Sequence, residues 1–171
     1  TEKLGDPLHP FEAFTASVCN LRPESRGHVH IKTEDSREPP KIQPDYLSDP
    51  ADRKVAADAI KLTRKIVSSP AMKKFEPEEF KPGIEFASDD DLAREAGNIG
   101  TTIFHPVGTC KMGPSSDNMA VVDERLKVHG IRGLRVVDAS VMPTITSGNT
   151  NSPTLMIAEK ASEMILEDAP S

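Results

Sequence analysis

The sequence is poor in aromatic residues: it contains no tryptophan, one tyrosine and six phenylalanines among 171 residues. Only 36% of its residues are hydrophobic, which is little for a domain of this length. We therefore expect either a modest core or apolar surface that meets something outside the chain. No apolar stretch approaches the roughly 20 residues that a membrane-spanning helix needs.

An excess of basic residues is also missing. The formal net charge is −6 and the basic residues are scattered, so the sequence predicts no nucleic-acid partner. Its two cysteines, Cys19 and Cys110, lie far apart and lack metal-ligand spacing, so no metal site is expected. The sequence does not exclude a disulfide between them, but it favours free thiols in a reducing cytoplasm. We expect a cytoplasmic protein, in solution or peripheral to a membrane.

Local signals predict one strand and two helices in the first 100 residues. Residues 27–33 alternate apolar and polar side chains, as a half-buried strand does, and residues 34–50 are expected to form a loop. Asp49 and Pro50 are typical of a helix start, and Ser88 with Asp91 resembles a capping box. The apolar faces expected to be buried are Val55, Ala59, Leu62 and Ile66 in the first helix, and Leu92, Ala96 and Ile99 in the second.

The last third of the sequence predicts strands, a polar loop and a long helix. Strand signals lie within residues 119–130, and Leu134–Ser140 reads as a compact apolar strand. Ser152 is the expected cap of the last helix and Pro153 its first residue. The buried face of that helix is expected to be Leu155, Ala158, Ala161 and Ile165. A strand, a polar loop and a capped helix start form a layout that can hold a cofactor.

The stretch "FHPVGTCKMG" carries the first candidate for chemistry, His105. Pro106 restricts the backbone of the residue before it, and Gly108 and Gly113 allow tight turns. His105 is therefore either a partly buried loop residue or a catalytic base held on a rigid turn. A metal site shared with Cys110 is the weaker interpretation, because no second pair of ligands lies nearby.

The other histidines have less support. His28 and His30 lie on one face of the expected strand, where they could bind a metal adventitiously. His129 is expected to be exposed between turns.

The loop before the last helix carries the second candidate site. Asp138 follows the expected strand, and its ordinary role would be to bond its own turn. The start of the last helix, however, places free N–H groups and partial positive charge beside this loop. An anionic or electron-accepting group could dock there.

Three segments together resemble a known family. "HPVGTCKMG", "LKVHGIRGLRVVDASVMP" and "SGNTNSPTLMIAEKAS" look like the C-terminal part of the glucose–methanol–choline oxidoreductases, which are FAD-dependent alcohol dehydrogenases and oxidases. The resemblance covers about residues 15–168 and is nearest to the choline-dehydrogenase-like branch. It implies an enzyme that oxidises a primary alcohol, choline-like or other, to an aldehyde.

The resemblance implies two catalytic residues. His105 matches the histidine that takes the proton of the substrate hydroxyl, or stabilises the resulting alkoxide, while hydride passes to flavin N5. Asn149 matches a second position that is His in some members and Asn in others. An asparagine can donate a hydrogen bond to the substrate oxygen but cannot act as a base, so His105 is the only base of the pair.

The resemblance also implies cofactor contacts. Asp138 and Ala139 match the segment that contacts the FAD diphosphate and ribityl chain. Thr150 and Asn151 match the segment near the N1–C2 edge of the flavin. The partners implied are an alcohol substrate and an electron acceptor, either O2 or a quinone-type carrier.

One family feature is missing from the sequence. None of its ten glycines forms the G-x-G-x-x-G fingerprint that holds the FAD diphosphate, and the chain starts with Thr1. We therefore expect the C-terminal portion of a longer protein, with an incomplete FAD site and no activity alone. Its further partner would be the N-terminal FAD-binding half, and its exposed apolar surface would favour a homodimer of the isolated piece.

The fold implied is α+β. Residues 1–118 would give most of an antiparallel sheet with packed helices, which is part of the substrate domain and includes the His105 loop. Residues 119–171 would complete the FAD-binding domain with a strand, a loop and a helix. The alternative function is a non-catalytic interaction or regulatory module that keeps this fold. A rigid His–Pro turn argues against it, since packing alone does not require one.

Overall fold

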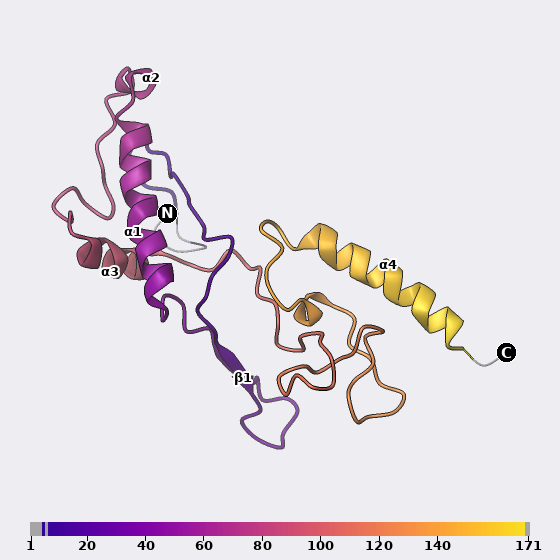
Figure 1. Ribbon diagram of the computed structural model, residues 1–171. Coiled ribbons are helices and arrows are strands. Elements are labelled where there is room, and N and C mark those ends of the chain that lie inside the picture. The colour runs from indigo at the N-terminus through magenta and orange to yellow at the C-terminus, as the bar shows by residue number, and fades with distance from the viewer. Residues whose placement is uncertain (1–4, 6, 170–171) are drawn as a thin grey trace. The chain divides into compact units, whose positions relative to one another are not determined.

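The computed structural model describes residue 5 and residues 7–169 (Figure 1). The chain divides into two compact units. Unit 1 consists of Thr1–Gly27 and Pro44–Thr102, and unit 2 of His28–Gln43 and Ile103–Ser171. Among the described residues, no helix is both long and apolar enough to cross a bilayer. Helices together with a small antiparallel sheet make the protein α+β, as expected.

Unit 1 is helical and consists of α1 (Pro50–Val67), α2 (Pro70–Lys73) and α3 (Asp89–Ile99), with α1 packed on α3. The predicted helix starts are confirmed. The Asp49 carboxylate accepts a hydrogen bond from the Ala51 N–H at 2.8 Å, and Pro50 is the first residue of α1. The Ser88 hydroxyl accepts from the Asp91 N–H at 3.1 Å and caps α3.

The predicted buried face of α1 is wrong. Asp52 and Ala57 are the fully buried residues of α1, while Val55, Leu62 and Ile66 are exposed. In α3 the prediction holds for Leu92, but Ile99 at the end of the helix is exposed. Two different neighbours therefore decide burial on α1: the helix α3, which contributes the buried Leu92, and the N-terminal segment, which brings polar groups to Asp52.

Asp52 anchors the N-terminal segment of unit 1 on α1. Its side chain is only 4% exposed. It accepts hydrogen bonds from the Asn20 side-chain amide at 3.0 Å, the Glu24 N–H at 2.9 Å and the Ser25 N–H at 2.8 Å. Burial would raise the pKa of Asp52, but the hydrogen bonds from Ser25 and Glu24 outweigh it and the pKa is lowered.

Arg64 orders the irregular chain that follows α2. Its guanidinium donates to both carboxylate oxygens of Glu79 at 2.8 Å and to the carbonyls of Gly83 and Phe86. The hydrogen bond from Arg64 holds the pKa of the Glu79 carboxyl below its usual value. A half-buried, bidentate pair of this kind fixes geometry more firmly than an exposed ion pair.

The sheet of unit 2 has two strands. β1 (His28–His30) pairs antiparallel with β2 (Lys41–Gln43), so that Val29 lies opposite Ile42. β1 is shorter than the strand predicted over 27–33, and β2 falls within residues 34–50, which were expected to be loop. Both central side chains are largely exposed, so this ribbon buries little within the described chain.

The rest of unit 2 contains little regular structure before its helix. The strands expected in 119–130 and 134–140 are wrong: this region forms only isolated bridges, such as Val122 with Val128 and Lys127 with Arg135. A short 3-10 helix, η1 (Ala139–Val141), and the helix α4 (Asn151–Glu167) follow. The buried core of unit 2 is Val122, Leu126, Val141 and Ala161.

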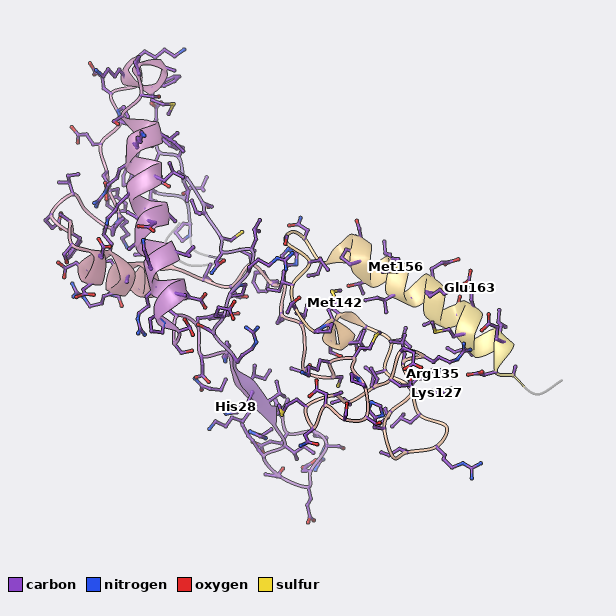
Figure 2. The ribbon with its side chains drawn as sticks, in the orientation of Figure 1. His28, Lys127, Arg135, Met142, Met156 and Glu163 are labelled. Carbon is purple, nitrogen blue, oxygen red and sulfur yellow. The ribbon has the colours of Figure 1, made fainter. Side chains whose placement is uncertain are left out.

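α4 begins earlier than predicted and turns a different face inward. Thr150, not Ser152, is its N-cap residue. Ala161 is buried as expected, but Leu155, Ala158 and Ile165 are exposed, and Ile157 packs on the core instead. Met156 also lies on the exposed side of the helix (Figure 2). The apolar residues left on the surface of α4 are Leu155, Met156, Ile165 and Leu166.

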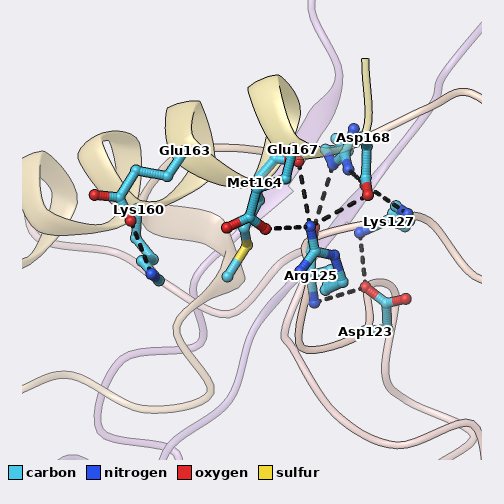
Figure 3. A network of polar contacts seen from close by, with 9 residues as sticks. Asp123, Arg125, Lys127, Lys160, Glu163, Met164, Glu167 and Asp168 are labelled. Atoms are coloured by element: carbon cyan, nitrogen blue, oxygen red, sulfur yellow. Dashed lines mark hydrogen bonds and ion pairs between the residues drawn. The ribbon is translucent and has the colours of Figure 1, made fainter. Parts of the chain in front are cut away.

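A cluster of ion pairs holds the C-terminal end of α4 (Figure 3). Asp168, which follows the helix, pairs with Lys127 at 2.6 Å, with Arg125 at 3.2 Å and with Arg135. Arg125 also donates to the Met164 carbonyl at 3.3 Å. The Lys127 ammonium holds the pKa of the Asp168 carboxyl below its usual value. Cations at a helix C-terminus are favourable because the helix dipole is negative there.

Replacing the buried carboxylate of unit 1 tests this account of its fold. Asp52→Asn should lower the free energy of unfolding of the chain at pH 7 by about 1.5–3 kcal/mol, because it removes charge-assisted hydrogen bonds from a buried site. Since the folded-state pKa is lowered, the stabilisation is fully present above the pKa of an unfolded Asp, about 3.9. It is lost as the pH falls through the lower folded-state value.

Urea denaturation at a series of pH values measures the difference. The matched control is Asp58→Asn, on the same helix, where an exposed carboxylate pairs with Lys54. An equal loss of stability in both variants, or a gap that does not narrow in acid, would contradict the role given to Asp52.

Candidate active site

The loop that carries His105 is fixed by backbone hydrogen bonds to the chain around η1. The Cys110 N–H donates to the Ser140 carbonyl at 3.1 Å, and the Met112 N–H donates to the Val141 carbonyl at 2.8 Å. Val141 is itself buried in the core of unit 2. The His105 loop and the Asp138–Met142 segment, which we expected to be two separate candidate sites, therefore form one structure.

Two left-handed backbone positions shape this loop. Phe104 has φ 63° and Gly108 has φ 89°. A side chain at Gly108 would meet the Met142 carbonyl at 3.5 Å, so the space is ordinary and the positive φ is what favours glycine there. The turn that follows is held by an ion pair of 2.7 Å between Lys111 and Asp117.

His105 contacts the start of α4. Its Nδ1 atom lies 2.9 Å from the hydroxyl Oγ1 of Thr150, within hydrogen-bond distance. His105 is half-buried and Thr150 is only 7% exposed. Residues 45 positions apart in the sequence are thus brought together.

The N-terminus of α4 has no side-chain cap. Thr150 is the N-cap residue, yet its hydroxyl makes no bond to the first turn of the helix, although such a bond is typically worth ~1 kcal/mol. Its carbonyl does take part in the helix, accepting from the Thr154 N–H at 3.0 Å and from the Thr154 hydroxyl at 2.7 Å. The Thr150 side chain therefore does not cap the first N–H groups of α4, and the positive end of the helix dipole lies beside His105.

The remaining predicted site residues lie next to these. Asn149 and Asn151 flank Thr150, and their side chains are exposed. Asp138 is also exposed, and its carboxylate accepts from the N–H of Ser140 at 2.8 Å and from the Ser140 hydroxyl. Asp138 therefore caps η1, the ordinary role considered for it, while Ala139 is the first residue of that helix.

The other histidines have different surroundings from His105. His129 was expected to be exposed, which is wrong: it is half-buried, and its Nε2 lies 3.0 Å from the Gly113 carbonyl. The rings of His28 and His30 are 4.8 Å apart on β1. Cys19 and Cys110 are free thiols. Across the described part of the chain, no three His, Cys, Asp or Glu side chains gather closely enough to hold a metal ion.

Sequence reasoning did not anticipate what the Thr150 hydroxyl binds. The pattern "GNTNSPT" offers four candidates for a helix cap, and Ser152 beside Pro153 is the strongest by local preference. A threonine hydroxyl directed out of its own helix has no local signature, because the partner comes from a distant loop.

The chain matches the family model described as GMC oxidoreductase over residues 23–158. An alcohol dehydrogenase (acceptor) from Pseudomonas putida is 46% identical over 90% of this chain and 27% of that protein. An oxygen-dependent choline dehydrogenase from Cronobacter sakazakii is 46% identical over 92% of this chain and 28% of that protein. The chain thus spans less than a third of the length of these relatives.

The fold agrees with the sequence match. A solved FAD-dependent oxidoreductase from Chaetomium thermophilum superposes with a TM-score of 0.78 and 30% identity, over 86% of this chain and 26% of that one. The range matched by the family model contains the His105 loop, η1 and the first turn of α4, which the structure joins into one site. The chain therefore belongs to the GMC oxidoreductase family.

Proposed function

We propose that this chain is the C-terminal part of an FAD-dependent alcohol dehydrogenase or oxidase that converts a primary alcohol to an aldehyde. One observation carries the proposal: the hydrogen-bond contact of 2.9 Å between His105 and Thr150. It brings the candidate base His105 to the N-cap residue of α4, which directly follows Asn149. Relatives named alcohol dehydrogenase and choline dehydrogenase at 46% identity support the same reaction class.

His105 acts as the base in this proposal. Its Nδ1 faces Thr150, so Nε2 is the atom available to take the proton of the substrate hydroxyl. Asn149 donates a hydrogen bond from its side-chain amide to the substrate oxygen, which stabilises negative charge as the proton leaves. The backbone turn at His105–Pro106 and the bonds from Cys110 and Met112 hold the base in place.

The residues around α4 fit the flavin end of FAD. The uncapped N–H groups at the start of α4 would face the N1–C2 edge through Thr150 and Asn151, where the helix dipole favours negative charge. Asp138 and Ala139 would contact the diphosphate and ribityl chain. Because the Asp138 carboxylate is engaged by Ser140, its contribution would come mainly from the backbone. When bound, FAD accepts the hydride from the alcohol carbon.

The apolar surface of α4 supports a partner within the same protein. Leu155, Met156, Ile165 and Leu166 are large apolar residues exposed on one helix in the described chain, and contact with another part of the protein would remove them from water. We infer that an N-terminal FAD-binding half covers it, with residues 119–171 completing the FAD domain and residues 1–118 contributing to the substrate domain. The electron acceptor would be O2 or a quinone-type carrier.

Removing the imidazole tests the assignment of the base. In the complete enzyme, His105→Ala should slow anaerobic flavin reduction by about 10²- to 10⁴-fold while the bound flavin content stays unchanged, because the base acts on the substrate proton. Stopped-flow absorbance of the flavin measures the rate. His30→Ala, which removes an exposed imidazole from β1, is the matched control. A His105→Ala enzyme that reduces its flavin at the normal rate would sink the assignment.

The division of roles between the two residues is tested separately. Asn149→Ala should slow flavin reduction by roughly tenfold or more, since one hydrogen bond to the developing charge is lost. The pH midpoint of the reduction rate should stay where it is, because an amide neither gains nor loses a proton. A pH–rate profile for wild type and variant decides the point: a large displacement of the midpoint would mean that Asn149 tunes the base.

A further inference from the structure

Thr150 departs from the usual behaviour of a helix-capping threonine. It occupies the N-cap position of α4, but its hydroxyl makes no bond to the helix and instead lies 2.9 Å from His105 Nδ1. Thr150 is only 7% exposed, so its hydroxyl is largely shielded from solvent. In an N-cap threonine the hydroxyl ordinarily accepts from the second or third N–H of its own helix.

The position of that hydroxyl is fixed from the backbone side. The Thr150 carbonyl accepts two hydrogen bonds from Thr154, one from its N–H at 3.0 Å and one from its hydroxyl at 2.7 Å. A β-branched side chain has few rotamers to choose from. Oγ1 of Thr150 is therefore a stationary partner for the imidazole, and α4 itself is held at its far end by the Asp168 ion pairs.

The contact at Nδ1 leaves Nε2 as the ring nitrogen that can face a substrate, and the direction of the hydrogen bond depends on the tautomer, since a hydroxyl can donate or accept. In neutral histidine one ring nitrogen carries hydrogen and the other a lone pair, and the partner of one sets the state of the other. Within the described chain the hydrogen bond of the His105 ring is the one to Thr150, through Nδ1. For Nε2 to take a proton, Nδ1 must carry the hydrogen and donate it to the Thr150 oxygen.

We propose that Thr150 is a positioning residue for His105: its hydroxyl oxygen accepts the Nδ1 hydrogen, holds the ring orientation and keeps the lone pair on Nε2 toward the substrate. This inference rests on the proposed function and adds to it. The substrate proton moves from the alcohol oxygen to Nε2, and the Nδ1–H···Oγ1 bond is kept before and after that transfer. The cofactor contact expected of Thr150 is left to its backbone.

The experiment uses three variants of the complete enzyme. Thr150→Val keeps the shape of the side chain and removes the hydroxyl, and Thr150→Ser restores the hydroxyl. Thr63→Val is the matched control, because it removes a part-buried threonine hydroxyl that donates to the Ala59 carbonyl within α1 rather than bonding His105. Flavin content and circular dichroism show whether each variant is folded.

Two measurements test the role of Thr150: the tautomer of His105 and the rate of flavin reduction. Long-range ¹H–¹⁵N spectra of enzyme labelled with [¹⁵N]histidine give the tautomer of His105, which is assigned by its loss in His105→Ala. We expect hydrogen on Nδ1 in wild type, Thr150→Ser and Thr63→Val, and a shift toward hydrogen on Nε2 in Thr150→Val. Anaerobic flavin reduction should slow about tenfold or more in Thr150→Val, as the wrong tautomer cannot accept the proton, and recover to within about threefold in Thr150→Ser.

A double variant separates this inference from the proposed function. If Thr150 acts through His105, Thr150→Val should slow the His105→Ala enzyme no further. Hydrogen on Nε2 in the wild type, an unchanged tautomer in Thr150→Val, or equal losses in Thr150→Val and Thr150→Ser would overturn the role of the hydroxyl. A His105→Ala enzyme with normal flavin reduction would instead overturn the proposed function itself.

Discussion

Two backbone hydrogen bonds, from Cys110 to Ser140 and from Met112 to Val141, hold the candidate site together. They attach a loop without regular structure to a segment whose Val141 is buried with Ala161 of α4. Because α4 is packed on that same core, the histidine on the loop and the hydroxyl at the helix start share one frame. Both bonds join main-chain atoms, so they set the path of the loop without using the side chains of Cys110 and Met112.

Local signals were enough to locate the helix starts. Asp49 before Pro50 and Ser88 before Asp91 act within a few residues, and each cap is made as the sequence predicts. Burial could not be deduced in the same way. Asp52 is buried because a segment some 30 residues away in sequence brings N–H groups to it, whereas Val55 on the same helix stays 42% exposed. β2 was missed because its three residues lie between prolines in a stretch typical of loops.

The site shows the same division between local and distant information. His105 was a candidate from its own motif, whereas Asn149 and Thr150 became candidates through the family resemblance. The contact between His105 and Thr150 was not predicted. The direction of the Thr150 hydroxyl was not predictable, since the cap preferences of "TNSP" favour Ser152. The Thr150 hydroxyl bonds the distant His105 ring instead of capping its own helix. A short window of sequence does not contain the information that decides between these two bonds.

The two ends of α4 are held by interactions of different physical kinds. Its C-terminal end is held by ion pairs of partly exposed charges, Arg125, Lys127 and Arg135 around Asp168. Its N-terminal end meets His105 through a part-buried bond of an uncharged hydroxyl group. Added salt weakens the attraction between solvent-exposed charges and has little effect on a bond to an uncharged group. Rising salt would therefore loosen the C-terminal end of α4 first. The hydrogen-bond geometry around the His105 imidazole, at the N-terminal end, would change last.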